Sequence, residues 1–305
     1  MTDAIQTTLR KSISCAGVGL HSGSEIHLTL HPAVAGSGIT FVRSDLAGLA
    51  IPARYDLVTD TTLGTSLARD GVAQVATVEH LMAALWGCGV DNAVVELDGP
   101  EVPAMDGSSE PFVFLIECAG IETLDAPRRS IRVLRPVAVD DGDKRIALYP
   151  AESLSVRFEI DFDNPVIGRQ AFNFIGVDGL FKTDLSRART FGLEAEVAAM
   201  HEAGLARGGS LDNAVVVGSE RVLNEDGLRF RDEFVRHKVL DCLGDLFLAG
   251  ARVIGRVEAV RAGHRLNNEL LHVLFADEAN WCYDDETPAR APDTLWSDEA
   301  VAAIA

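Results

Sequence analysis

A histidine and a carboxylate one helical turn apart are the residues of this chain whose spacing best suits metal chemistry. His237 and Asp241 lie in Phe-Val-Arg-His-Lys-Val-Leu-Asp-Cys-Leu-Gly-Asp, where apolar residues recur at helical spacing. On a helix the two side chains share one face, where an imidazole and a carboxylate can bind one zinc ion. The alternative is an ordinary surface charge pair, so the assignment needs support from elsewhere in the chain.

A second helix-like stretch supplies another histidine in a similar setting. His80 lies near the start of Thr-Val-Glu-His-Leu-Met-Ala-Ala-Leu-Trp-Gly, which we expect to be a helix from Thr77, its N-cap, to Gly87. Gly87 follows His80 by seven residues, as Gly244 follows His237. Two imidazoles and one carboxylate would leave a fourth position for water, which is the pattern of a catalytic zinc site. Zinc lowers the pKa of such a water to about 7.

Acid–base candidates accompany these three residues. Glu79 directly precedes His80 and can reach a metal-bound water as general base, although a first-turn acidic residue also suits the helix dipole. His264 falls at a strand-to-helix junction and could protonate a leaving amine with Asp245 holding its ring; a helix cap or a buried histidine is the alternative. Thr190 could donate to an oxyanion, a contact worth roughly 3 kcal/mol, or could simply end a strand.

Strand and helix patterns recur in the same order in both halves of the chain, each half carrying strands, a helix with a histidine near its start, a short strand and a second helix. We therefore expect an α+β fold of two similar domains, each a sheet with a pair of packed helices, whose helix layers face each other in a sandwich. That packing would bring His80 to His237 and Asp241 at the domain interface, where ligand sites tend to lie. The expected segments are strands at 12–16, 25–30 and 93–97 with helices at 77–87 and 106–119, then strands at 132–139, 145–149, 155–161, 214–217 and 251–259 with helices at 234–248 and 266–275.

The expected domain limits follow from this order. We place the N-terminal domain at 1–126, the C-terminal domain at 127–283 and an acidic tail at 284–305, with 124–129 as a linker. The stretch 190–217 is unusually apolar and is either ordinary core or the lining of a channel for an alkyl chain. About ten buried methylenes in such a channel would contribute on the order of 8 kcal/mol to binding.

Composition excludes several classes of function. The chain has 27 Lys and Arg against 46 Asp and Glu, a net charge of −19, which disfavours nucleic acids and anionic membranes as partners. It shows neither a signal peptide nor an apolar run long enough to span a bilayer, so we expect a cytoplasmic protein, and we take it to be a monomer. The five scattered cysteines form no C-x-x-C, which argues against a sulfur-rich zinc site.

Taken together, seven motifs resemble those of the UDP-3-O-acyl-N-acetylglucosamine deacetylase family, in the right order and from about residue 5 to about residue 277. They are Gly-Val-Gly-Leu-His-Ser-Gly (17–23), Thr-Val-Glu-His-Leu-Met-Ala-Ala-Leu (77–85), Met-Asp-Gly-Ser-Ser-Glu-Pro-Phe (105–112), Ser-Arg-Ala-Arg-Thr-Phe-Gly (186–192), Gly-Gly-Ser-Leu-Asp-Asn-Ala (208–214), Arg-His-Lys-Val-Leu-Asp-Cys-Leu-Gly-Asp-Leu (236–246) and Gly-His-Arg-Leu-Asn-Asn (263–268).

The resemblance implies a zinc-dependent hydrolase that removes the N-acetyl group of UDP-3-O-(3-hydroxyacyl)-N-acetylglucosamine, the committed step of lipid A synthesis in the cytoplasm of Gram-negative bacteria. The implied roles are zinc ligands His80, His237 and Asp241, general base Glu79, general acid or oxyanion partner His264, its orienting residue Asp245, oxyanion donor Thr190 and substrate contact Lys238. The implied acyl passage, within 190–217 and a neighbouring loop, is formed by Leu20, Phe191, Val197, Gly209, Ala214 and Val216. The residues implied to hold UDP are Lys144, Asp161, Phe162 and Arg261.

Two other functions remain compatible with these residues. One is a zinc amidase acting on a different acylated amino sugar, with the same core and another nucleotide pocket. The other is a non-catalytic binding protein that kept the fold, although such a protein would not need a general base at Glu79. The ligand set also suits Fe²⁺ as well as Zn²⁺.

Overall fold

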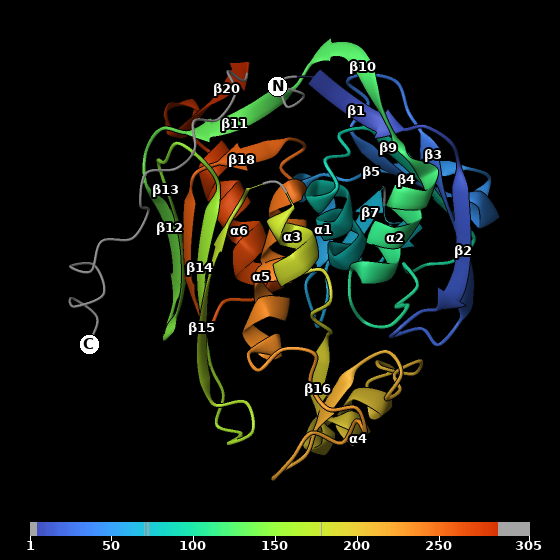
Figure 1. The fold of residues 1–305 in the computed structure, drawn as a ribbon, viewed down its shortest axis with the longest axis vertical. Coiled ribbons are helices and arrows are strands. Elements are labelled where there is room, and N and C mark those ends of the chain that lie inside the picture. The colour runs from blue at the N-terminus through green and yellow to red at the C-terminus, as the bar shows by residue number, and fades with distance from the viewer. Residues whose placement is uncertain (1–4, 70, 72, 178, 286–305) are drawn as a thin grey trace.

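The computed structural model describes residues 5–69, 71, 73–177 and 179–285, and these form two halves with elements in matching order (Figure 1). The first half comprises β1 (Ile5–Leu9), β2 (Ile13–Val18), β3 (Glu25–Pro32), β4 (Ile39–Arg43), η1 (Ser44–Leu46), β5 (Leu49–Pro52), η2 (Tyr55–Leu57), β6 (Val58–Asp60), β7 (Ser66–Arg69), β8 (Ala73–Val75), α1 (Glu79–Gly87), β9 (Ala93–Leu97), α2 (Glu110–Ala119) and β10 (Ile121–Pro127).

The second half follows directly. It comprises β11 (Arg129–Val133), β12 (Val137–Asp141), β13 (Lys144–Tyr149), β14 (Ser155–Asp161), β15 (Arg169–Ile175), α3 (Leu180–Asp184), β16 (Phe191–Leu193), α4 (Glu194–Glu202), β17 (Val215–Val217), α5 (Glu233–Phe247), β18 (Arg252–Ile254), β19 (Arg256–Val260), α6 (His264–Phe275), η3 (Glu278–Asn280) and β20 (Trp281–Asp285).

Within the described residues, each half has a five-stranded sheet, and the two sheets share one strand order. The first runs β2-β3-β9-β4-β5 and the second β12-β13-β19-β14-β15. The middle strand of each sheet, β9 or β19, follows the other four strands of that sheet in the sequence. It is antiparallel to one neighbour and parallel to the other. This shared order confirms the predicted pair of similar α+β units.

The helix layers of the two halves face each other, as predicted. In Figure 1 α1 and α2 lie beside one sheet, α5 and α6 beside the other, and α1 packs against α5 in the middle. The approach is close, because a Cβ atom added at Gly244 would lie 2.1 Å from the backbone oxygen of Glu79. Residues 79–86 of α1 are all buried, so this short helix is enclosed on every side.

Residues 190–217 form a small unit of their own that projects from the body of the molecule (Figure 1). Phe191 pairs with Val215 and Leu193 with Val217, so β16 and β17 are parallel, and α4 makes the connection between them. A parallel pair needs such a crossover, since a tight turn can join only antiparallel strands. The unit is attached to α5 through the ring of Phe191, whose centroid is 4.9 Å from that of Phe234.

Several local predictions were wrong. Val78, not Thr77, is the N-cap of α1, because Thr77 has a positive φ of 56° and its hydroxyl donates to Glu101 instead. The helix expected from residue 106 begins at Glu110, since Asp106 accepts the Ser108 N–H in a turn.

The predicted linker at 124–129 is instead the end of β10 and the start of β11. Within it, Pro127 pairs with Ile5 of β1 and Arg129 with Asp285 of β20, and such pairing with distant strands is not visible in local composition. The expected strand 132–139 is likewise divided between β11 and β12. The domain boundary at 126/127 stays a prediction. Of the predicted tail, residues 284 and 285 end β20, and residues 286–305 lie outside the described residues.

Among the described residues, no helix combines the length and the apolar character required to cross a bilayer.

Candidate active site

The facing helices bring His80, His237 and Asp241 together at the interface of the two halves. Oδ1 of Asp241 lies 3.3 Å from Nε2 of His237 and 3.5 Å from Nε2 of His80. One possible ligand atom from each residue lies within 4.8 Å of the others, and all three residues are buried. Since α1 supplies one donor and α5 the other two, the cluster depends on contact between the halves.

The protonation states of His237 and Asp241 fit a divalent cation. Nδ1 of His237 donates to the carbonyl of Ala188 at 3.1 Å, which leaves Nε2 as a free acceptor, and burial lowers the pKa of this imidazole to about 3. Burial alone would raise the pKa of Asp241, but His237 and Lys238 outweigh it and hold that pKa well below its usual range. Its buried Oδ1 has no hydrogen-bond partner among the described residues. A neutral imidazole with a free ring nitrogen and an ionised carboxylate with a free oxygen are the forms that metal ligands adopt.

Glu79, Asp245 and His264 form a second cluster beside the first. Nδ1 of His264 lies 2.9 Å from Oδ2 of Asp245, and its Nε2 lies 3.8 Å from Oδ2 of Asp241. Burial would lower the pKa of His264, but the carboxylate of Asp245 outweighs it and the pKa rises to about 9. Burial raises the pKa of Glu79, partly offset by His264 and His80. A protonated histidine beside a carboxylate of raised pKa is an acid and a base that can both act near neutral pH.

Two residues that complete this cluster were not predicted. Thr65 donates its backbone N–H to Oε2 of Glu79 at 2.9 Å and its hydroxyl to Oδ1 of Asp245 at 2.6 Å. Asn267 donates its side-chain amide to Oδ2 of Asp245 at 2.8 Å. The spacing could have revealed Asn267, which follows His264 by three residues on α6, whereas Thr65 lies in a loop without periodicity.

Thr190 and Lys238 adjoin the cluster in different ways. Thr190 is half-buried, and its backbone N–H donates to the carbonyl of Gly107 at 2.8 Å. It lies two residues after Ala188, whose carbonyl accepts from His237. Nζ of Lys238 donates to Oδ2 of Asp241 at 2.7 Å, so this ammonium, implied to contact substrate, also pairs with a predicted metal ligand.

The four residues implied to hold UDP gather at one end of the second sheet. Arg145 of β13 and Glu159 of β14 both lie opposite Val260 of β19, so the adjacent strand ends carry the set together. These ends supply Lys144, Asp161 with Phe162, and Arg261, which pairs with Asp143 at 2.7 Å.

Aromatic rings join this sheet end to the metal cluster. The ring of Phe162 lies 5.7 Å from that of Phe191, and Phe191 lies 6.2 Å from the imidazole of His237. Phe162, one of the residues implied to hold UDP, is therefore linked through Phe191 to the cluster of His80, His237 and Asp241.

The residues implied to form the acyl passage lie in or beside the β16–α4–β17 unit. Leu20, Phe191, Val197, Ala214 and Val216 are half-buried, and Gly209 is exposed.

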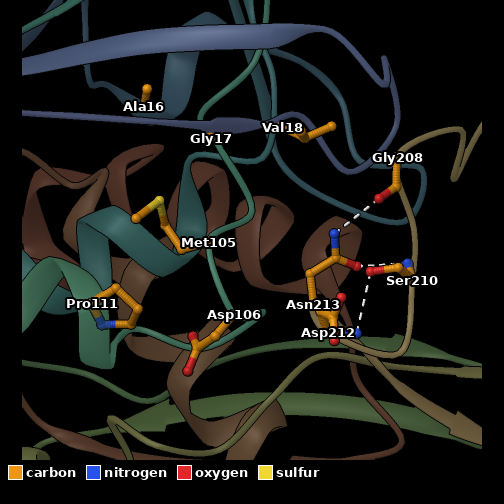
Figure 2. A pocket seen from close by; sticks show the side chains of 10 residues that line it. All are labelled: Ala16, Gly17, Val18, Met105, Asp106, Pro111, Gly208, Ser210, Asp212 and Asn213. Carbon is orange, nitrogen blue, oxygen red and sulfur yellow. Dashed lines mark hydrogen bonds between the residues drawn. The ribbon is translucent and has the colours of Figure 1, made fainter.

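A cavity of about 530 Å³ is lined partly by the loop 208–213 of this unit, but not by the residues implied to form the passage. Figure 2 shows it between β2, the turn before α2 and the loop 208–213, where Asn213 donates to the carbonyl of Gly208. None of the six passage residues lines it, and the passage stays a prediction.

Two buried histidines and a carboxylate beside an acid–base cluster are the arrangement typical of a metal-dependent hydrolase. Comparison with known proteins identifies the family within that class. The family model of UDP-3-O-acyl N-acetylglycosamine deacetylase matches residues 6–276. The chain is 52% identical over 286 residues to the UDP-3-O-acyl-N-acetylglucosamine deacetylase of Myxococcus xanthus, covering 93% of this chain and 90% of that relative. It is 50% identical over 308 residues to the protein of the same name from Anaeromyxobacter, covering 99% of this chain and 100% of that relative. The chain therefore belongs to the UDP-3-O-acyl-N-acetylglucosamine deacetylase family.

Proposed function

We propose that this protein hydrolyses the N-acetyl group of UDP-3-O-(3-hydroxyacyl)-N-acetylglucosamine, giving the free amine and acetate, in the synthesis of lipid A. The observation that carries the proposal is the convergence of Glu79, His264 and the trio His80, His237 and Asp241 in a chain that matches the family from residue 6 to 276.

We assign the cation site to His80, His237 and Asp241, with Zn²⁺ as the ion and Fe²⁺ as one that the same ligands suit. A bound divalent cation would polarise the acetyl carbonyl and lower the pKa of a water molecule. The hydrogen bond from Nδ1–H of His237 to the carbonyl of Ala188 fixes the tautomer whose Nε2 is free to bind the cation. Hydrogen-bond partners beyond the ligands commonly orient metal-bound histidines in this way.

The proton transfers belong to Glu79 and His264. Thr65 binds Oε2 of Glu79, and we assign to Oε1 the proton taken from the attacking water. His264, kept protonated by Asp245, gives a proton to the amine nitrogen as the amide C–N bond breaks. Thr190 donates to the oxygen that gains negative charge, and Lys238 adds a positive charge beside the reacting group.

The nucleotide binds at the sheet end formed by β13, β14 and β19. Lys144 and Arg261 supply local positive charge for the pyrophosphate in a chain whose net charge is −19. Asp161 accepts hydrogen bonds from the nucleotide, and Phe162 offers it an apolar face. The acyl chain lies along Leu20, Phe191, Val197, Gly209, Ala214 and Val216. The protein acts in the cytoplasm as a monomer.

The deciding experiment is mass spectrometry of acetate released from UDP-3-O-acyl-N-acetylglucosamine, with and without a chelator. Metal-dependent acetate release supports the proposal, and its absence from a metal-loaded preparation overturns it. Competition by millimolar UDP separates this function from that of an amidase with another substrate, since an enzyme without a nucleotide pocket would not respond.

A further inference from the structure

Glu101 is a buried carboxylate to which the proposed chemistry gives no role. Its exposed fraction is 1%, yet it lies between the chain that enters α1 and the loop 19–23. Oε1 accepts from the backbone N–H of His21 at 2.9 Å and from the hydroxyl of Thr77 at 3.0 Å, while Oε2 accepts from the N–H of Ser22 at 2.8 Å. A buried carboxylate is stable only when such donors replace water, so these bonds fix the relative positions of both segments.

On one side Glu101 holds the loop that carries Leu20. Space there is so restricted that a Cβ atom at Gly19 would lie 2.4 Å from Oε2 of Glu101. The outer side of this loop contacts the β16–α4–β17 unit. The backbone carbonyl of Leu20 accepts from the N–H of Gly208 at 3.0 Å, and that of His21 accepts from the N–H of Arg207 at 3.3 Å. The carboxylate thus supports the place where the first half meets the predicted acyl passage.

On the other side Glu101 holds a strained residue directly before the catalytic helix. Thr77 is buried and has a φ of 56°, a left-handed conformation that a β-branched residue rarely adopts. Such a conformation persists only when its surroundings enforce it. The hydroxyl bond to Glu101 is one restraint, and Ala76 on the preceding side donates to Pro100 at 2.9 Å and accepts from Val102 at 3.0 Å. Two residues after Thr77 the chain presents Glu79.

We propose that Glu101 is a positioning residue that couples the wall of the acyl passage at Leu20 to the catalytic helix through Thr77. Its carboxylate fixes the backbone turn at Thr77 and thereby the positions of Glu79 and His80. It also fixes the position of the loop 19–23, which contacts the β16–α4–β17 unit. This inference rests on the proposed function for the roles of Leu20 and Glu79, but the coupling of the two segments does not.

The kinetic test compares two variants with a matched control. Glu101→Gln cannot accept from all three donors, and Thr77→Val removes the hydroxyl bond while keeping the branched shape and the loop bonds. Asp91→Asn is the control, because Asp91 also accepts from a backbone N–H and a hydroxyl, those of Thr7 at 2.8 and 3.2 Å, but lies beyond the far end of α1.

We expect both Glu101→Gln and Thr77→Val to lower kcat roughly 10- to 100-fold, the scale of a small misplacement of reacting groups. Glu101→Gln alone should also raise KM for the acylated substrate, about fourfold for one methylene of lost burial. Its KM for UDP-N-acetylglucosamine, which has no acyl chain, should stay unchanged. Asp91→Asn should change neither constant. Unchanged kcat in Glu101→Gln, or equal effects in Asp91→Asn, would overturn the proposal.

Amide hydrogen exchange with metal analysis tests the coupling without any activity. Glu101→Gln should speed exchange at both residues 19–23 and residues 78–82, Thr77→Val at 78–82 alone, and Asp91→Asn at neither, while every variant binds one equivalent of metal. Faster exchange at a single segment in Glu101→Gln would show that the two are not coupled. If the wild-type protein failed to release acetate, the proposed function would fall, and this exchange pattern would still decide the coupling.

Discussion

The two helices that build the site occupy equivalent places in their halves but differ in what they contribute. α1 has 9 residues and supplies Glu79 and His80 from an otherwise apolar, buried segment. α5 has 15 residues and carries Glu233, His237, Asp241 and Asp245 at intervals of four, all of them buried. A spacing of four places such side chains along one face of a helix. The common fold therefore provides the frame, and divergence of one helix provides most of the chemistry.

The polar face of α5 is stable because each group has its own partner. His237 donates to Ala188, Asp241 accepts from Lys238, and Asp245 accepts from Thr65 and Asn267. Glu233 is fully buried and accepts from Nε of Arg189 at 2.8 Å and from its backbone N–H at 3.0 Å. Arg189 lies between Ala188 and Thr190, so this ion pair fixes the segment that orients His237.

The largest effect should follow from removing a donor of α5. We expect His237→Ala to lose the metal and with it all measurable turnover, because two remaining donors hold a cation poorly. Metal analysis after gel filtration, together with acetate release, makes the measurement. Stoichiometric zinc in this variant would contradict the ligand assignment.

Removing the proposed base on α1 should leave metal binding intact. We expect Glu79→Ala to bind one equivalent of metal and to lose about 10²- to 10⁴-fold in kcat, the usual value of a general base. Glu110→Ala is a suitable control, since Glu110 also begins a helix but is exposed. If Glu79 served only the helix dipole, the two variants would behave alike and deacetylation would be near normal.

The Glu233 ion pair should act on metal affinity. We expect Glu233→Gln to weaken metal binding about 10-fold, the lower end of the range for residues that orient ligands. Competition with a chelator gives the affinity. Asp232→Asn is the control, because Asp232 pairs with Arg236 at 2.6 Å nearer the surface. This variant should leave the metal affinity unchanged. Equal metal affinities in the two variants would show that the Arg189–Glu233 pair stabilises the fold without orienting His237.

The smallest effect on activity should come from the two helix glycines, whose replacement should act mainly on stability. A Cβ at Gly244 would meet the backbone of Glu79 at 2.1 Å, whereas one at Gly87 would meet the ring of Phe181 at 2.0 Å. We expect each alanine variant to lose about 1–3 kcal/mol in the free energy of unfolding by urea, the cost of overpacking. Gly244→Ala alone should also reduce kcat, because it pushes the two halves apart at the base. Equal kcat values would show that the site tolerates that shift.

The sequence predicted the parts of the site that depend on helical spacing. His237 with Asp241 could be recognised because a helix places residues four apart on one face. Glu79 and His80 are adjacent, and they were recognised from the helix pattern around them and from the repeated order of elements in the two halves. Thr65 and the carbonyl of Ala188 could not be recognised, since a loop hydroxyl and a main-chain oxygen have no periodicity.

The errors share a cause. The supposed linker at 124–129 forms strands whose partners are distant in sequence, and Thr77 was assigned a capping role that its left-handed backbone does not allow. Both outcomes depend on tertiary contacts, which local pattern does not contain.

The identical strand order of the two sheets has an evolutionary consequence. A duplicated ancestor that paired as a homodimer would repeat every side chain about a two-fold axis, so a base could not arise without a second copy opposite it. Gene fusion removes that constraint. If His80 is aligned with His237, Arg236 corresponds to Glu79 and Ala84 to Asp241, so the two copies no longer carry the same groups. Covalent linkage thus permits an asymmetric reaction centre at a pseudosymmetric junction.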